Sequence, residues 1–178
     1  MDGERWALRK LVRGAFSLAF VGWFLVFFDV TITGFDILPD VVGYVLVAIA
    51  CARLEDLHRT FAPVRWLAIM MSVVSGVMIM APAEIRVFWW WVAVTLEVAT
   101  MAWFCTAIAT AAIEHQEDEL AAIARSRRNW MIATSILAMA IIPVIPRSIE
   151  MAVLFGVVAI VMISFFLGLV RRAKRIAW

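Results

Sequence analysis

Six apolar runs, each long enough or nearly long enough to cross a membrane as a helix, follow one another along this chain of 178 residues. A helix needs about 20 mostly apolar residues to cross the hydrocarbon core of a bilayer. The runs cover residues 14–33, 38–53, 66–81, 87–110, 129–143 and 149–170. Glycine, proline or charged residues separate them, as expected where helices end. The pattern predicts one all-α domain, residues 1–178, built as a bundle of six transmembrane helices.

The composition excludes several other classes of protein. Hydrophobic residues make up 65% of the chain and charged residues 17%, whereas an ordinary soluble domain has about half and about a quarter. A soluble protein of this size leaves roughly a third of its chain surface in water after folding. A soluble fold could therefore not bury this much apolar surface. A soluble enzyme and a disordered tail are therefore excluded. Because the chain has only 2 cysteines, a disulfide-rich secreted module is excluded too.

The distribution of basic residues predicts the orientation of the bundle. If the N-terminus is cytoplasmic, every lysine and arginine except Arg86 and Arg147 falls in a cytoplasmic segment. Cytoplasmic segments of membrane proteins carry an excess of these residues. We therefore expect both termini to lie on the cytoplasmic side of a bacterial inner membrane.

Tryptophans provide an independent check on this topology. Trp66 and Trp130 fall at the predicted inner ends of the third and fifth runs, and residues 89–91 at the outer end of the fourth. Indole rings are enriched at the headgroup level, so these positions match the two membrane surfaces. Trp23 and Trp103 fall inside apolar runs, where we expect them to pack against lipid.

Glu97 is the most informative single residue. It is the eleventh residue of the run that starts at residue 87, about 15 Å along the helix and near the midplane. Apart from Arg53 at the very end of the second run, no lysine, arginine or histidine lies inside any of the runs. An ionised acid at that depth costs at least ~2.5 kcal/mol, so a protonated carboxyl or one beside water is expected. Glu97 then either binds protons or cations, or donates a hydrogen bond to a threonine or serine of a neighbouring helix.

The first run carries small residues along one face. Ala15, Ala19 and Gly22 follow one another at spacings of three and four residues, and small residues let a neighbouring membrane helix approach closely. Asp29 continues the same face near the end of the run. We therefore expect these small residues to pack inward and to take Asp29 into the bundle.

Residues 35–44 read Phe-Asp-Ile-Leu-Pro-Asp-Val-Val-Gly-Tyr. This segment resembles a signature of the form ILPDxxGY that follows the first span in small, uncharacterised bacterial membrane proteins. The resemblance implies a protein of the bacterial inner membrane and implies no activity. In physical terms, Asp36 and Asp40 either cap the free N–H groups of the next helix or form, with Asp29 and near Tyr44, an acidic entrance on the outer side.

A second, shorter resemblance concerns the first run. The substrate-binding components of energy-coupling-factor vitamin transporters also have about six spans, a similar length and both ends inside. They dock through an Ala-x-x-x-Ala motif on the first helix, to which Ala15 and Ala19 are similar. The Trp-rich five-span sensory proteins are of similar size, but their motifs are missing here and their span count differs.

These observations support two functional interpretations. The first is small-solute binding or transport, with Glu97 as the buried proton- or cation-responsive group and four residues at its outer entrance: Asp29, Asp36, Asp40 and Tyr44. The second is a non-catalytic accessory or scaffold subunit that binds another membrane protein through small-residue helix faces: Ala15, Ala19 and Gly22. The partners expected are membrane lipids, a small polar or cationic solute, and a membrane-protein partner or a second copy. A nucleic-acid partner is not expected.

An enzyme is the third interpretation, and little in the chain favours it. No residue stands out as a nucleophile, and no glycine-rich phosphate loop or zinc-protease motif is present. His58 and His115 both fall in predicted cytoplasmic connections, which excludes a bis-histidine haem inside the bundle. We therefore expect no cofactor and no metal site.

Overall fold

The computed structural model describes residues 2–27, 31–32, 35–36, 40–80, 82–141 and 149–176. Within these residues the chain forms α1 (Asp2–Phe27), α2 (Asp40–Leu54), α3 (Phe61–Met80), α4 (Ala83–Glu114), α5 (Asp118–Ile141) and α6 (Ile149–Arg175). Between α1 and α2 lie two-residue strands, β1 (Thr31–Ile32) and β2 (Phe35–Asp36), which pair antiparallel. The predicted all-α fold class is confirmed.

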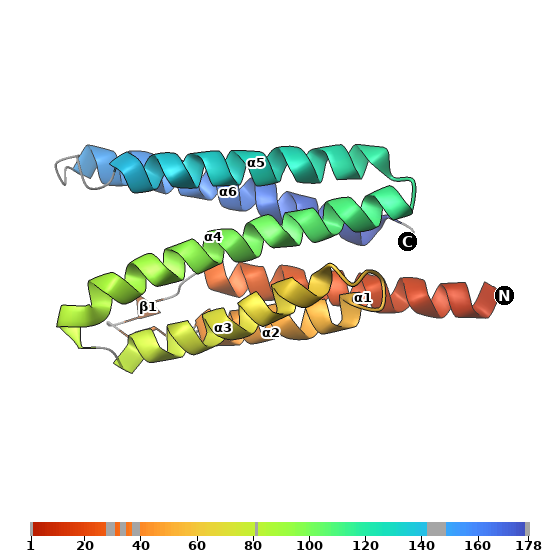
Figure 1. Ribbon diagram of the computed structural model, residues 1–178, viewed down its shortest axis with the longest axis horizontal. Coiled ribbons are helices and arrows are strands. Elements are labelled where there is room, and N and C mark those ends of the chain that lie inside the picture. Colours follow the sequence, from red (N-terminus) through yellow and green to blue (C-terminus); the bar gives the residue numbers. More distant parts are fainter. Residues whose placement is uncertain are drawn as a thin grey trace.

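The helices form a closed ring in chain order. Each helix packs against the next one, and α6 returns to pack against α1. Both termini and the α2–α3 and α4–α5 connections lie at one end of the bundle, and the α3–α4 connection and β1 lie at the other (Figure 1). The segments that carry most of the lysines and arginines are therefore gathered at one end.

Helix α1 ends earlier than the apolar run predicts. The run extends to residue 33, but α1 stops at Phe27, and Thr31 and Ile32 lie in β1. Residues 30–33 are all β-branched (Val-Thr-Ile-Thr), and such side chains favour extended backbone over helix. Hydropathy alone cannot detect this change, because the β-branched residues are nearly as apolar as the helix before them.

A sharp turn separates the fourth helix from the polar residues that follow it. Helix α4 ends at Glu114, and Gln116 adopts a positive φ of 61°. The Glu117 N–H then donates to the Ala112 carbonyl oxygen at 2.8 Å, which is the 6→1 hydrogen bond of a Schellman helix end. The charged residues after this turn form the first turns of α5.

Helices α1 and α2 approach so closely that their glycine backbones touch. A Cβ atom placed on Gly22 would lie 2.8 Å from the Gly43 carbonyl oxygen, and one placed on Gly43 would lie 2.8 Å from the Gly22 carbonyl oxygen. On the same face of α1, Ala15 and Ala19 are fully buried. The small residues of α1 therefore pack inside the bundle, against α2.

The centre of the ring is filled by aromatic side chains. Trp23 is 0% exposed, and its ring meets those of Tyr44, Phe104 and Phe166 edge-on, with centroids 6.1, 6.3 and 5.0 Å away. The expectation that Trp23 faces lipid is thus wrong. It lies four residues after Ala19, on the inward face of α1, so helical periodicity carries it into the core.

Three helical segments among the described residues are long enough and apolar enough to cross a membrane: Arg9–Phe27, Phe61–Met80 and Phe88–Glu114. They belong to α1, α3 and α4. Helix α2 has 15 residues, which is a length of about 22 Å, less than the ~30 Å of a hydrocarbon core. Because α2 is short, it does not extend along the full length of α3 and α4.

Candidate functional site

A pocket of about 320 Å³ lies where α2 begins, between α3 and α4. Helices α3 and α4 extend past the start of α2 toward the end of the bundle that is opposite the termini (Figure 1). The pocket brings together three of the predicted site residues, Glu97, Asp40 and Tyr44. Its other lining residues are Met71, Ser75, Met78, Ile79, Trp90, Ala93 and Val94.

Helical periodicity explains why these residues share one cavity. On α4, Trp90, Ala93, Val94 and Glu97 follow one another at the spacing that places side chains on one face. The lining residues of α3 show the same spacing from Met71 to Ile79, and those of α2 are one turn apart. Each helix thus contributes a single face, and the late start of α2 leaves the space between α3 and α4 unfilled.

The carboxyl group of Glu97 borders this cavity and has no hydrogen-bond or ion-pair partner in the part of the chain that the structure describes. Glu97 is partly buried, and it forms no hydrogen bond or ion pair with any other residue that the structure describes. Among the described residues, those that line the pocket include no lysine, arginine or histidine. Within the described chain, neither a threonine nor a serine accepts a hydrogen bond from Glu97, so its carboxyl is available to a ligand or to water.

Asp40 and Tyr44 form the α2 side of the pocket. Asp40 is the first residue of α2, where a negative charge is stabilised by the positive end of the helix dipole, and its side chain also lines the cavity. The two interpretations of Asp40 are therefore compatible. Tyr44 lies one turn further in and is 1% exposed. Since its ring contacts that of Trp23, it connects the pocket to the aromatic core.

The chemistry of the pocket suits a cation better than an anion. Two carboxyl groups, Asp40 and Glu97, face the same space, and the rings of Tyr44 and Trp90 border it. Aromatic faces attract organic cations, most strongly where water is excluded. Among the described residues, no group of three or more histidine, cysteine or acidic side chains is placed to hold a metal ion. A pocket of this volume falls in the usual range for small ligands.

The remaining predicted site residues lie elsewhere or are not described. Asp29 lies outside the described residues. Asp36 lies in β2, in register with Thr31 of β1. On α1, Ala15 and Ala19 are fully buried within the chain itself, so they are not exposed as a docking motif would have to be.

Sequence reasoning did not find the α3 side of the pocket. Met71, Ser75 and Met78 lie at helical spacing, and a hydroxyl between two thioethers is a weak signal in an apolar run. Identifying them requires knowing which face of α3 is turned toward Glu97. Trp90 had been assigned to the outer membrane surface, and its contribution to the pocket was missed.

Comparisons with protein-family models, with curated proteins and with solved structures find no match to this chain. The functional argument therefore depends on the geometry and chemistry of the chain's own residues.

Proposed function

We propose that the protein is a bacterial inner-membrane protein that binds or transports a small cationic solute, with both termini on the cytoplasmic side. In this arrangement all six helices enter the bilayer, and the pocket between α2, α3 and α4 opens toward the outer side. The observation that carries the proposal is the carboxyl of Glu97, which faces a cavity and has no partner among the described residues.

The topology is supported by charge and by aromatic residues. The end of the bundle that holds both termini also holds the α2–α3 and α4–α5 connections (Figure 1), and these segments contain most of the basic residues. The positive-inside rule places such an end in the cytoplasm. Exposed tryptophans such as Trp66 and Trp130 are then at the level where indole rings are enriched.

The position of Glu97 supports a functional rather than a structural carboxyl. It lies seven residues after Trp90 on α4, about 10 Å further along the helix axis. Placing an acidic side chain at such a depth costs free energy unless the side chain faces water, a partner or a ligand. Because a cavity faces Glu97, a bound cation or a proton is the natural way to neutralise it.

The scaffold interpretation loses the surface on which it was based. It required the small residues of α1 to be open to another membrane protein. Instead, Gly22 lies against Gly43 of α2, and Ala15 and Ala19 are fully buried. The same α1 face serves packing within the chain, so binding of a solute is the better supported function.

The direct test uses the substitution Glu97→Gln, which keeps the shape of the side chain and removes its charge. We expect ethylammonium, added as the probe, to raise the melting temperature of the purified wild-type protein and to have no effect on Glu97→Gln. Reconstituted vesicles should take up labelled methylammonium through the wild-type protein and at least about tenfold more slowly through the variant, the loss expected when a buried charge partner is removed.

Glu84→Gln is the matched control, because Glu84 is an exposed residue of the first turn of the same helix. This variant should keep the wild-type response to both probes. Equal responses of wild type and Glu97→Gln to ethylammonium and methylammonium would contradict the proposed role of Glu97.

A further inference from the structure

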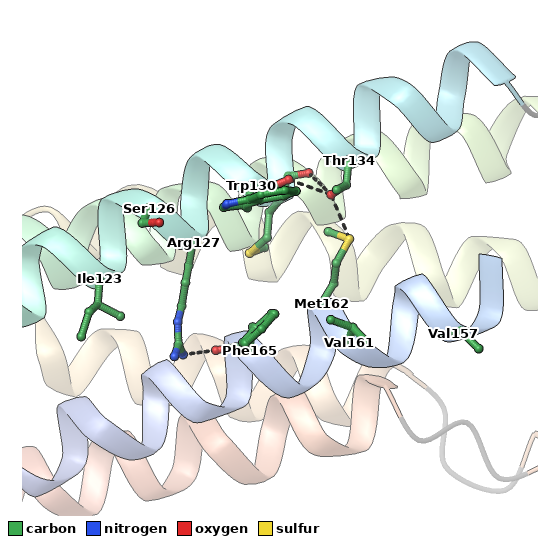
Figure 2. Close-up of a pocket in the computed structure, with 10 residues that line it drawn as sticks. Ile123, Ser126, Arg127, Trp130, Thr134, Val157, Val161, Met162 and Phe165 are labelled. Carbon is green, nitrogen blue, oxygen red and sulfur yellow. Dashed lines mark hydrogen bonds between the residues drawn. The ribbon is translucent and has the colours of Figure 1, made fainter. Parts of the chain in front are cut away.

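A second, larger cavity lies on the other side of the bundle, between α5 and α6. It has a volume of about 740 Å³. Helix α5 packs more extensively on α4 than on α6, which leaves a groove between the two helices (Figure 2). The described residues that line it are Ile123, Ser126, Arg127, Trp130, Met131, Thr134, Val157, Val161, Met162 and Phe165.

The groove is apolar along most of its length. The Thr134 hydroxyl of α5 lies 2.9 Å from the Met162 sulfur of α6, which is one of the contacts between the two walls (Figure 2). Large apolar side chains at its edges are exposed, among them Trp130 at 70% and Phe165 at 59%. From Phe165 to Val157 the groove follows α6 for about 12 Å.

One end of the groove opens into a cluster of arginines. A neighbouring cavity of about 550 Å³ is lined by Arg127, Gly168, Arg171, Arg172, Arg175 and Ile176. Arg127 lines both cavities, so the apolar groove and the basic cluster are continuous. Among the described residues, Arg172 has Glu119 as an acidic partner, whereas Arg171 and Arg175 are exposed and form no ion pair with any described acidic residue.

Arg127 is held at the junction of the two cavities. Its side chain reaches from α5 to α6, where Nη1 donates a hydrogen bond to the carbonyl oxygen of Phe165 (Figure 2). Gly168 leaves the space for it, because a Cβ atom there would lie 3.3 Å from Nη1. Burial lowers the pKa of the Arg127 guanidinium, and the positive charge of Arg172 lowers it further. An anion at this point would relieve that repulsion.

We infer that the α5–α6 groove binds one anionic phospholipid of the inner leaflet, with its phosphate among the arginines and an acyl chain along the apolar walls. The arginines lie at the end of the bundle that carries both termini (Figure 1), which is the cytoplasmic end in the proposed topology. The planar guanidinium group of arginine can donate two parallel hydrogen bonds to two phosphate oxygens, and its positive charge complements the charge of the phosphate. A free phosphate would occupy only the basic end and leave the groove unfilled, so the two joined cavities favour a lipid.

The test compares phosphatidylglycerol with phosphatidylcholine, each titrated into the purified protein in detergent and followed by native mass spectrometry. We expect wild type to prefer phosphatidylglycerol. The double variant Arg171→Gln/Arg175→Gln should lose about thirtyfold of that preference, because each basic residue near an anionic headgroup contributes about fivefold. Reading the ratio of the two lipids within each variant cancels any general loss of stability.

Arg9→Gln/Arg13→Gln is the matched control, because these arginines have the same spacing, are exposed, and lie on α1 toward the same end of the bundle. It should keep the wild-type preference. Filling the groove with Val161→Trp should weaken phosphatidylglycerol binding, while Val73→Trp, at an exposed position of α3 outside the groove, should not.

Each of three results of the lipid titrations would overturn the inference: equal binding of the two lipids by wild type, an equal loss of preference in the two arginine double variants, and phosphatidylglycerol binding that Val161→Trp leaves unchanged. Inorganic phosphate is the remaining probe. If inorganic phosphate alone binds as tightly as phosphatidylglycerol in the same measurement, the basic cluster is a site for a soluble anion and the lipid inference is wrong. Among the described residues, this site and the Glu97 pocket share no lining residue, so either proposal can fail alone.

Discussion

Trp23→Ala is expected to lower the free energy of unfolding by about 3 kcal/mol, because it removes the ring at the centre of the aromatic core. Trp23 is fully buried and contacts rings from α2, α4 and α6. In water-soluble proteins the loss reaches about 5 kcal/mol. Inside a bilayer the transfer contribution is smaller, since lipid chains solvate an exposed indole, and the lost packing dominates.

Unfolding by sodium dodecyl sulfate in mixed micelles, followed by circular dichroism, measures this loss. Trp103→Ala is the control, since Trp103 is 48% exposed on α4 and should lose less than about 1 kcal/mol. Trp23→Phe refines the test. The indole N–H of Trp23 has no hydrogen-bond partner among the described residues, so phenylalanine should lose volume only. A loss for Trp103→Ala as large as that for Trp23→Ala would mean that Trp23 is not the centre of the core.

Gly22→Val is expected to be about as damaging, with a loss of about 3 kcal/mol, at the upper end of the range for overpacking. A Cβ at this position would come within 2.8 Å of the Gly43 carbonyl oxygen and 2.9 Å of a Val47 methyl group. Backbone atoms cannot rotate away as a flexible side chain does, so α1 and α2 would have to separate. The buried face of α1 around Ala19 would then lose its contacts as well.

Gly14→Val provides the comparison on the same helix. A Cβ at Gly14 would have no atom within 4 Å, so valine there should change the free energy of unfolding by less than about 0.5 kcal/mol. The same titration with sodium dodecyl sulfate measures the free energy of unfolding of both variants. Equal losses at residues 14 and 22 would show that the cost comes from valine in a helix and not from the contact between α1 and α2.

Much of the fold follows from the sequence because long apolar runs and their charged boundaries are strong signals. Six helices appear among the described residues, and each overlaps one of the predicted runs, although several begin well before the run does. The errors occur where hydropathy carries no information about backbone conformation. Thr31 is apolar enough to continue a helix but lies in a strand. Gln116 is a polar residue in a polar segment, and its side chain gives no indication that its φ is positive.

The candidate site was only partly predictable, for a related reason. Glu97 stands out because a carboxyl in an apolar run is costly, and Asp40 and Tyr44 because they belong to one short motif. Ser75 and the other α3 residues of the pocket carry no such cost. The same applies to Trp23, whose inward position depends on which face of α1 is buried. Sequence periodicity identifies a face, but only the packing of neighbouring helices shows what that face meets.

The most direct test of the central claim is the accessibility of the Glu97 pocket from the outer side. Ser75→Cys places a thiol in the pocket and leaves Glu97 in place. Cys51 and Cys105 are buried, so the wild-type protein is the unreactive control. Whole cells are treated with two membrane-impermeant methanethiosulfonates, one carrying a trimethylammonium group and one a sulfonate, and each rate is normalised to that of free glutathione.

The account predicts that the trimethylammonium reagent modifies Ser75→Cys about tenfold faster than the sulfonate reagent, because a negatively charged cleft concentrates cations. Adding Glu97→Gln should bring the two rates closer together. If neither reagent reacts from outside, or if both react equally fast with Glu97 intact, the pocket is not an outward-facing cation site and the proposed function is contradicted.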